Sequence, residues 1–260
     1  MARDVVLAAV SLLTASARDV ALAEQAYRYQ RNDSRRKGPV LLEALGEFGH
    51  GLWPCFFEEE WLPSEMPDGT EQGYGYRLCG LEVLQQRPSC IVYSFGSNDE
   101  FDFEDAILAR TKCTVRIFDP APSKSSHPLA PTVLPVALGR TDGMEMLRWW
   151  AQSLPTPTPT RTLQSLMREF GDEQIDILKV DIEGGEHALV GQAWPHVGQL
   201  VMEVHLQPRF SFDLGDLRRL VHAAEAADLR LFHIDRPWKY CGFSCLLLCF
   251  IHRDYGSTWT

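Results

Sequence analysis

Two pairs of ionisable residues near the ends of apolar runs are the side chains best placed to do chemistry. Asp181 and Glu183 follow the apolar run 175–180, and Glu203 and His205 close a second run of this kind. Residues two apart in an extended segment point to the same side. Ligands of open α/β sheets bind at the carboxyl ends of strands. These four residues are therefore our candidate catalytic groups.

Such groups suit the activation of a hydroxyl. A neutral hydroxyl attacks well only if its proton is removed or a metal polarises its oxygen. We expect His205, oriented by a carboxylate, to be the base, and we assign no metal ligand because the sequence does not give the distance between the two strands. Two alternatives remain: the acids hold a divalent cation, or Glu203 and His205 form a structural hydrogen-bonded pair while Asp181 contacts only a cofactor ammonium.

A glycine turn and a later acid predict a nucleoside site. Residues 90–95 are typical of a strand that Gly96 ends, 101–112 has helical spacing, and 114–118 alternates as a strand that ends on Asp119. A carboxylate at the tip of the second strand of such a unit can accept both ribose O–H groups. The unit therefore predicts ribose binding at Asp119.

The residues after Gly96 favour a cationic ligand. A dinucleotide site uses several glycines so that bare backbone approaches a diphosphate, whereas Gly96 stands alone. Five acids follow it, namely Asp99, Glu100, Asp102, Glu104 and Asp105. They would repel a diphosphate but tolerate an ammonium and a sulfonium. We therefore expect S-adenosylmethionine rather than NAD or ATP; the alternative is a plain strand-to-helix connection.

The remaining pattern predicts a doubly wound α/β domain. Seven strands are expected near residues 91, 114, 132, 175, 200, 229 and 245. Helices alternate with most of them, among them 162–170, stopped by Gly171, and 214–226. This alternation implies a largely parallel sheet with helices on both faces.

Three segments between 132 and 160 carry weaker expectations. Thr132–Leu138 is predicted to be the third strand, and its Ala137 is expected beside the adenine. Residues 144–151 are predicted to form a short helix. Leu154–Thr160 alternates Pro and Thr, which favours an exposed polyproline connector.

Composition limits the class of acceptor. The 260 residues are 45% hydrophobic and 23% charged, enough for one large core, and the formal net charge is −10. Nucleic-acid affinity depends on clustered Lys and Arg. We therefore expect a small or neutral acceptor and no nucleic acid.

The chain divides into residues 1–73, an extension of helical and loop cover, and the domain 74–260. Val5–Leu13 is apolar but too short to span a bilayer, so no stable membrane span is expected. Ala15-Ser-Ala resembles a cleavage site, which would make 1–17 a signal segment; the alternative is an amphipathic helix. Both the cytoplasm and the secretory pathway therefore remain open.

The chain has seven cysteines. Cys79 and Cys90 are close enough in sequence to pair in an oxidising compartment. Cys241, Cys245 and Cys249 invite comparison with an iron–sulfur triplet. The residues between them are mainly apolar, so we expect small buried hydrophobes on one strand face instead.

Four blocks together resemble the methyltransferase-like protein 24 family, which is related to FkbM-type S-adenosylmethionine-dependent methyltransferases. They are Cys90-Ile-Val-Tyr-Ser-Phe-Gly-Ser-Asn, the following Phe-Asp-Phe-Glu, Ile117-Phe-Asp-Pro and Ile175-Asp-Ile-Leu-Lys-Val-Asp-Ile-Glu-Gly-Gly-Glu. The similarity runs from about Tyr74 to His205, and the Cys79 and Cys90 pair also fits it.

The resemblance implies a class I methyltransferase fold, Rossmann-like, whose seventh strand is antiparallel. It implies that Gly96 and its neighbours hold the methionine part of the cofactor and that Asp119 and Pro120 meet the ribose. The neighbours in question are Ser94, Phe95, Ser97, Asn98 and, after the later strand, Asp181. FkbM-type relatives methylate hydroxyls, which favours O-methylation of a small molecule or glycan. A non-catalytic binding domain and an NAD or nucleotide-sugar enzyme remain as alternatives.

Overall fold

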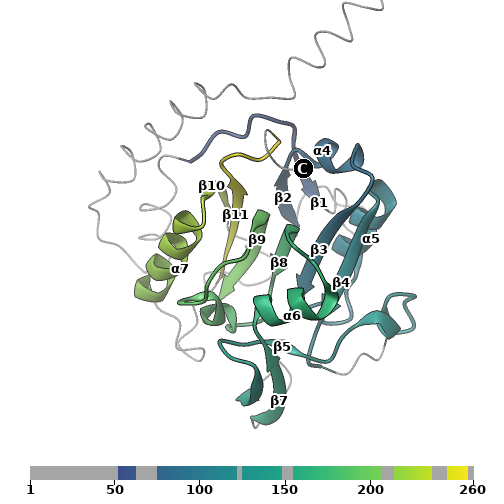
Figure 1. Cartoon of the computed structure of the whole chain (residues 1–260), viewed down its shortest axis with the longest axis vertical. Helices are drawn as coiled ribbons and strands as arrows, with labels where there is room; N and C mark the ends of the chain where they lie inside the picture. Colours follow the sequence, from purple (N-terminus) through teal and green to yellow (C-terminus); the bar gives the residue numbers. More distant parts are fainter. Residues whose placement is uncertain are drawn as a thin grey trace, which may run out of the picture.

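The computed structural model describes residues 52–62, 75–121, 125–147, 155–205, 214–235 and 245–256. A six-stranded sheet forms the centre of the molecule, with the strand order β10-β11-β9-β8-β3-β4 (Figure 1). Its strands are β3 (Cys90–Phe95), β4 (Cys113–Phe118), β8 (Ile175–Val180), β9 (Val197–His205), β10 (Leu229–Asp235) and β11 (Cys245–His252). The mixed α/β fold expected from the sequence is confirmed.

Strand direction within this sheet follows the predicted class. β4, β3, β8 and β9 run parallel, and β11 pairs antiparallel with both β9 and β10. The expected antiparallel last strand is therefore confirmed. The chain leaves β3 towards β4 on one side and later returns to β8 on the other side, so the order of strands reverses between β3 and β8. Ligands of such sheets bind at this reversal, outside the carboxyl ends of the strands.

Helices flank the sheet at both edges (Figure 1). The described helices are α4 (Leu81–Gln85), α5 (Asp102–Arg110), α6 (Leu163–Phe170) and α7 (Leu214–Ala226), with short 3-10 turns η1 (Ala130–Thr132) and η2 (Glu186–Leu189). α5 packs on β4 and α7 on β10. Gly171 ends α6 in the left-handed conformation, with a φ of 72°, as expected. None of the described helices is long and apolar enough to cross a membrane.

The expected third strand at Thr132–Leu138 is wrong. Only Leu134 pairs beside β4, as a single parallel bridge to Phe118. Its N–H donates to the Ile117 carbonyl at 2.9 Å and its carbonyl accepts from the Asp119 N–H at 3.0 Å. Prolines on both sides of this residue lack the N–H that a longer ladder needs. A seventh position next to β4 is therefore occupied by one residue rather than by a strand.

The next segment forms a separate sheet of three strands, in the order β5-β7-β6, instead of a helix and a connector. Its strands are β5 (Ala137–Leu138), β6 (Gly143–Leu147) and β7 (Thr156–Arg161). The helix expected at 144–151 is wrong where the residues are described, and the polyproline connector is wrong because β7 is paired on both sides. Thr158 and Thr160 of β7 are buried while its prolines face outward.

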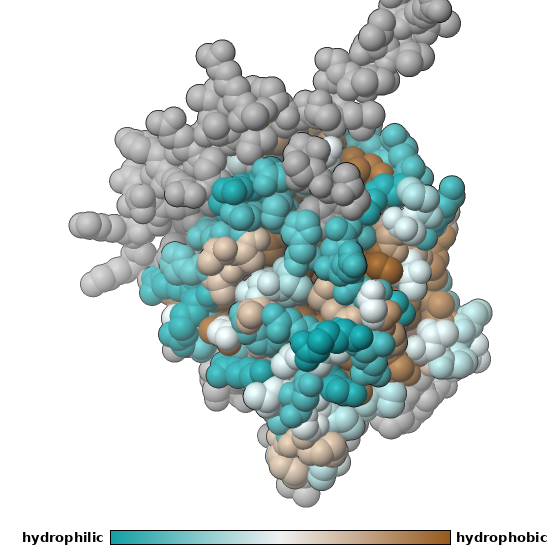
Figure 2. Space-filling model, in the orientation of Figure 1, coloured by the Kyte–Doolittle hydropathy of each residue, from teal (hydrophilic) through white to brown (hydrophobic). Residues whose placement is uncertain are grey.

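This small sheet projects from the body and carries apolar side chains at its tip (Figure 2). Met144 and Met146 of β6 are each 63% exposed. Teal, hydrophilic residues cover much of the rest of the face seen in Figure 2.

The described end of the N-terminal extension packs into the domain. β1 (Glu59–Leu62) pairs antiparallel with β2 (Tyr76–Cys79). The side-chain amide of buried Gln199, on β9, bonds both the N–H and the carbonyl of Cys79 and so takes the place of a neighbouring strand. The predicted signal segment and the N-terminal helix lie outside the described residues.

Two disulfides replace the predicted pairing of Cys79 with Cys90. Cys55 bonds Cys79, and Cys90 bonds Cys113. The sequence prediction was wrong because the strand register brings Cys113 directly opposite Cys90 in the β3–β4 ladder.

The C-terminal cysteines do not form a metal cluster within the described residues. Cys245 is disulfide-bonded, and Cys249 is a buried free thiol whose pKa burial raises to about 12. Cys241 lies outside the described residues. The expectation of small buried side chains on a strand is confirmed for the two cysteines of β11.

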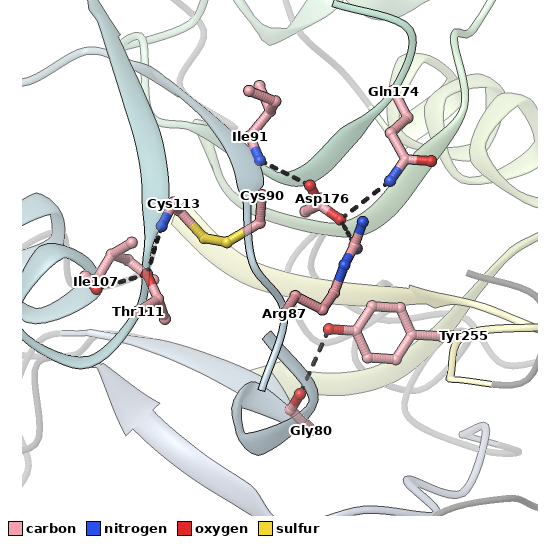
Figure 3. The surroundings of a disulfide bond; sticks show 10 residues. All are labelled: Gly80, Arg87, Cys90, Ile91, Ile107, Thr111, Cys113, Gln174, Asp176 and Tyr255. Atoms are coloured by element: carbon pink, nitrogen blue, oxygen red, sulfur yellow. Dashed lines mark hydrogen bonds and ion pairs between the residues drawn. A yellow bond between two sulfur atoms is a disulfide. The ribbon is translucent and has the colours of Figure 1, made fainter. Parts of the chain in front are cut away.

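The amino ends of the parallel strands are also joined by a buried carboxylate (Figure 3). Asp176, on β8, accepts from the Arg87 guanidinium, from the Ile91 N–H at 2.7 Å and from the Gln174 amide at 3.3 Å. The Cys90–Cys113 disulfide lies beside this group (Figure 3). This end of the sheet is therefore held by covalent and ionic links.

Removing the disulfide tests its contribution to stability. Cys90→Ser combined with Cys113→Ser opens a loop with a sequence separation of 23 residues, and such loops stabilise a fold by about 3 kcal/mol. We expect a loss of about that size in the free energy of unfolding, measured by denaturant titration without reductant. Cys249→Ala, which removes a buried thiol and opens no loop, is the control. An equal loss in both proteins would show that the covalent link adds nothing.

Candidate functional site

The four predicted catalytic residues meet at the carboxyl ends of β8 and β9. Atoms of Asp181, Glu183 and His205 that can act as ligands lie within 4.8 Å of one another. His205 Nε2 lies 3.5 Å from Glu183 Oε2 and 3.4 Å from Glu203 Oε1. The structure therefore brings together the residues that the sequence placed on two strand ends.

Asp181 and Glu183 lie in the turn that follows β8, and this turn, rather than the alternation of an extended strand, brings their side chains together. β8 ends at Val180, and Glu183 has a φ of 52°, in the left-handed region. A non-glycine residue there costs free energy and persists only where its surroundings hold it. Two of the other three such residues in the described chain, Asn98 and Asp99, follow β3 at the same edge. Unfavourable backbone conformations thus concentrate where the site is expected.

His205 is held on its other ring nitrogen by a residue that the sequence analysis missed. Its Nδ1 lies 3.0 Å from Oε1 of Glu186, whose side chain is fully buried on η2. Glu186 Oε1 also accepts from the Gly184 N–H at 3.2 Å. The Gly-Gly-Glu at the end of the quoted 175–186 block was the available signal for this residue.

The carboxylates keep the imidazole charged. Burial lowers the pKa of His205, but its hydrogen bonds to Glu186 and Glu203 and the nearby negative charges outweigh burial and raise that pKa to about 11. Burial raises the pKa of Glu183, and the neighbouring acids raise it further while His205 opposes them. An imidazolium has no lone pair with which to take a proton, so a carboxylate is the better base in this arrangement.

The Gly96 turn is tied to Asp119 at the tip of β4. Oδ2 of Asp119 accepts from the Asn98 N–H at 2.8 Å and lies 3.5 Å from the Ser97 hydroxyl, and Oδ1 accepts from the Ala121 N–H at 2.8 Å. The predicted acid therefore lies directly against the predicted turn. Oδ1, which accepts one of these hydrogen bonds, has a further lone pair with which to accept from a ligand.

Gly96 is required by its neighbour on β8. Its φ is 82°, and an added Cβ would lie 1.7 Å from the Asp181 carbonyl oxygen. Contact of this glycine with the methionine part of a cofactor stays a prediction, and the neighbour that an added Cβ would meet is the backbone directly after β8. A bulky substitution would therefore disturb the turn itself, and it does not make a clean test of ligand binding.

The other predicted cofactor residues differ in how far they face this edge. Ser94 is buried and its hydroxyl donates to Glu104, and Phe95 is buried against Phe118 with ring centroids 4.6 Å apart. Pro120 is half-buried next to Asp119. Ala137 lies in β5, beside Thr160 of the small sheet. The side chains of Ser94 and Phe95 thus pack in the core, and only their backbone belongs to the edge.

Two further residues at the edge carried little sequence signal. The hydroxyl of Tyr76 donates to Asp181 Oδ2 at 3.1 Å. The ammonium of Lys179 donates to the Gly96 carbonyl at 2.6 Å and lies 5.9 Å from the Tyr76 ring centroid. Lys179 was visible as one of two charged residues in an otherwise apolar strand, while nothing marked Tyr76. Lys179 links the turn after β3 to β8, and Tyr76 links β2 to the residue that follows β8.

Glu100 adds to the negative charge beside the turn. Burial raises its pKa, as do the charges of Asp102 and Asp181, while Lys179 opposes them. Glu104, another acid of the predicted cluster, is instead buried against Ser94. Of the five acids that follow Gly96, Glu104 alone is buried in the core.

A parallel sheet with an antiparallel last strand, a glycine turn tied to the next strand's acid, and further acids at the order reversal define a class I methyltransferase fold. Residues 69–243 match the family model described as the methyltransferase FkbM domain. The chain belongs to the FkbM methyltransferase family.

Curated relatives carry the same family relation. The chain is 31% identical over 156 residues to "Probable methyltransferase-like protein 24" of Homo sapiens, covering 55% of this chain and 42% of the relative. For the protein of that name in Rattus norvegicus, identity is 30% over 166 residues, covering 59% and 45%. The match thus spans less than half the length of these relatives.

A solved structure shows a more distant likeness. The fibrillarin pre-rRNA processing protein of Methanococcus jannaschii is 12% identical, with a TM-score of 0.39, over 65% of this chain and 69% of that chain.

The charge on His205 can be tested without a substrate. Glu186→Gln keeps the size of the side chain but removes a negative charge that favours the imidazolium, so it should lower the pKa of His205 from its value of about 11. The measurement is an NMR titration of the His205 ring signals between neutral and alkaline pH. A His205 ring that loses its proton near neutral pH in the unmodified protein would contradict the assigned charge.

Proposed function

We propose that this chain is an S-adenosylmethionine-dependent methyltransferase that methylates a hydroxyl of a small molecule or glycan. The proposal rests on one observation: two sets of residues lie together at the edge of the sheet where the strand order reverses, between β3 and β8. One is the Gly96 turn tied to Asp119. The other is the cluster of Asp181, Glu183 and His205.

The chemistry of the turn fits this cofactor. Asp119 carries oxygens that accept from N–H and O–H groups at the tip of β4, which suits a pair of ribose hydroxyls. Glu100 and Asp181 add negative charge beside the turn, which favours a ligand with an ammonium and a sulfonium and disfavours a diphosphate. We assign the methionine part to the segment from Gly96 to Asn98 and the adenine to the backbone near Ala137.

The acid and histidine cluster suits the acceptor. When bound, the cofactor supplies an electrophilic methyl group, and the protein must then supply a place for the proton of the acceptor hydroxyl. Glu183, with 39% of its side chain exposed, is open to an incoming molecule, whereas His205 is buried. His205 lies between Glu183 and the buried Glu186 and orients the carboxylates around it.

Ligand-induced stabilisation tests the cofactor. Specific binding raises stability by about 2.7 kcal/mol at a hundredfold excess over the dissociation constant. S-adenosylmethionine or S-adenosylhomocysteine should therefore raise the unfolding temperature, and NAD should leave it unchanged. Stabilisation by NAD alone would favour a dinucleotide enzyme, and no stabilisation by any of the three would favour a domain without cofactor.

Asp119→Asn tests the ribose assignment. Asparagine keeps one oxygen for the turn but loses the charge, and hydrogen bonds to a charged group contribute about 1.5–3 kcal/mol. We expect the affinity for S-adenosylhomocysteine, measured by calorimetry, to fall by about tenfold or more. Glu173→Gln, an exposed glutamate before β8 at the opposite end of the sheet, is the control. Unchanged affinity in Asp119→Asn would place the ribose elsewhere.

We also propose that the protein works in an oxidising compartment, because disulfides persist there and are rare in the cytosol. The two disulfides of the described domain and the bonded Cys245 support this proposal.

Alkylation of intact protein from a eukaryotic host, followed by mass spectrometry, tests the compartment. Cys55, Cys79, Cys90 and Cys113 should be protected until a reductant is added, and a cleaved signal segment would leave Arg18 as the first residue. Seven reactive thiols after unfolding without reductant would support the cytoplasm instead.

A further inference from the structure

We infer that Asp181, Glu183 and His205 bind a divalent metal ion, which holds and polarises the acceptor hydroxyl; the second half of this inference rests on the proposed function. The three residues come from two neighbouring strand ends. The ligand-type atoms of all three lie within 4.8 Å of one another. The sequence alone does not give this separation, and for that reason we predicted a histidine base and assigned no metal ligand.

The first argument is the orientation of the histidine. A histidine that binds a metal through one ring nitrogen usually donates its other N–H to a carboxylate, which fixes the ring. His205 has this arrangement, with Nδ1 3.0 Å from Glu186 Oε1 and Nε2 turned towards Glu183 and Glu203. An ion at Nε2 would take the place of the proton there, since a metal ligand must be the neutral ring.

The second argument comes from Glu186, which is not one of the three proposed ligands. Its side chain is fully buried, and its Oε2 has no hydrogen-bond partner in the described structure. An unsatisfied buried carboxylate oxygen is costly. A positive ion bound at Nε2, on the side of the ring opposite Glu186, offsets part of that cost through its charge.

The third argument is the balance of charge. Four carboxylates, those of Asp181, Glu183, Glu186 and Glu203, surround one imidazole. The nearby ammonium of Lys179 is hydrogen-bonded to the Gly96 carbonyl. One proton on the imidazole leaves three of these negative charges uncompensated, and a divalent ion in place of that proton leaves two.

The ligand types indicate the class of metal. Two carboxylates and one imidazole suit Mn²⁺, Mg²⁺ or Zn²⁺ rather than a soft-metal thiolate site. Three protein ligands leave positions for an acceptor oxygen, and the half-exposed Glu183 lies on the side that solvent reaches. A bound metal lowers the pKa of a coordinated hydroxyl. The proton released from that hydroxyl passes to Glu203, which the ligand set does not require.

Manganese binding tests the site. The full chain, with its disulfides intact, is treated with EDTA, desalted and titrated with MnCl₂, and free Mn²⁺ is followed by electron paramagnetic resonance. We expect one bound equivalent. Glu183→Gln and His205→Gln should each weaken binding by at least about tenfold, and Glu186→Gln by about 10–100-fold, the usual effect of removing such a supporting carboxylate. Glu173→Gln should bind like the unmodified chain.

The controls separate this inference from the proposed function. The folding of each variant is checked by its unfolding temperature. Should His205→Gln not fold, the result for Glu183→Gln is the one that tests the site. Free Mn²⁺ throughout the titration of the unmodified chain would overturn the metal site, and so would binding by Glu183→Gln and His205→Gln as tight as that of the unmodified chain. If the metal site fails, stabilisation by S-adenosylhomocysteine still supports the proposed function. If the chain binds Mn²⁺ but S-adenosylhomocysteine does not stabilise it, the proposed function alone is overturned.

Discussion

The contact between the turn after β3 and the end of β8 holds the whole candidate site together. The Asp181 N–H donates to the Phe95 carbonyl at 3.0 Å, and the Lys179 ammonium donates to the Gly96 carbonyl at 2.6 Å. No Cβ fits at Gly96 because the Asp181 carbonyl oxygen occupies that space. The Gly96 turn and the acidic cluster are therefore two sides of one backbone contact. A change on either side is transmitted to the other.

Burial of acids at the carboxyl edge of the sheet lowers the stability of the fold, and it also fixes the side chains of the candidate site. Glu186 and Glu203 are almost fully buried, and charged groups in such places need partners. His205 provides a partner for both through its two ring nitrogens. The arrangement fixes three side chains with one imidazole. It leaves Glu183, at the open side of the cluster, as the member that can change its contacts when a ligand arrives.

Much of this arrangement could be predicted from the sequence, because strand ends and acids at fixed spacing are local features. The six long strands and the helices α5, α6 and α7 follow from local periodicity, and the pairing of Glu203 with His205 follows from their spacing. The disulfides could not be predicted, since they depend on the register between β3 and β4. Nor could the role of Glu186, because a turn between Glu183 and η2 brings it under His205. The strand β7 was missed because its alternating prolines are typical of an unpaired segment, although its threonines are buried and its backbone pairs on both sides.

The Cys90–Cys113 bond has a consequence for how the sheet opens. It joins the first residue pair of the β3–β4 ladder, at the end of the strands opposite Gly96 and Asp119. Two strands bonded covalently at one end can separate only from the other. Local opening of this part of the sheet therefore begins at its carboxyl edge, and backbone amides there exchange with solvent sooner than those near the disulfide. The edge that carries the candidate site is thus also the edge that opens first, while the spacing of the strands is kept at their amino ends.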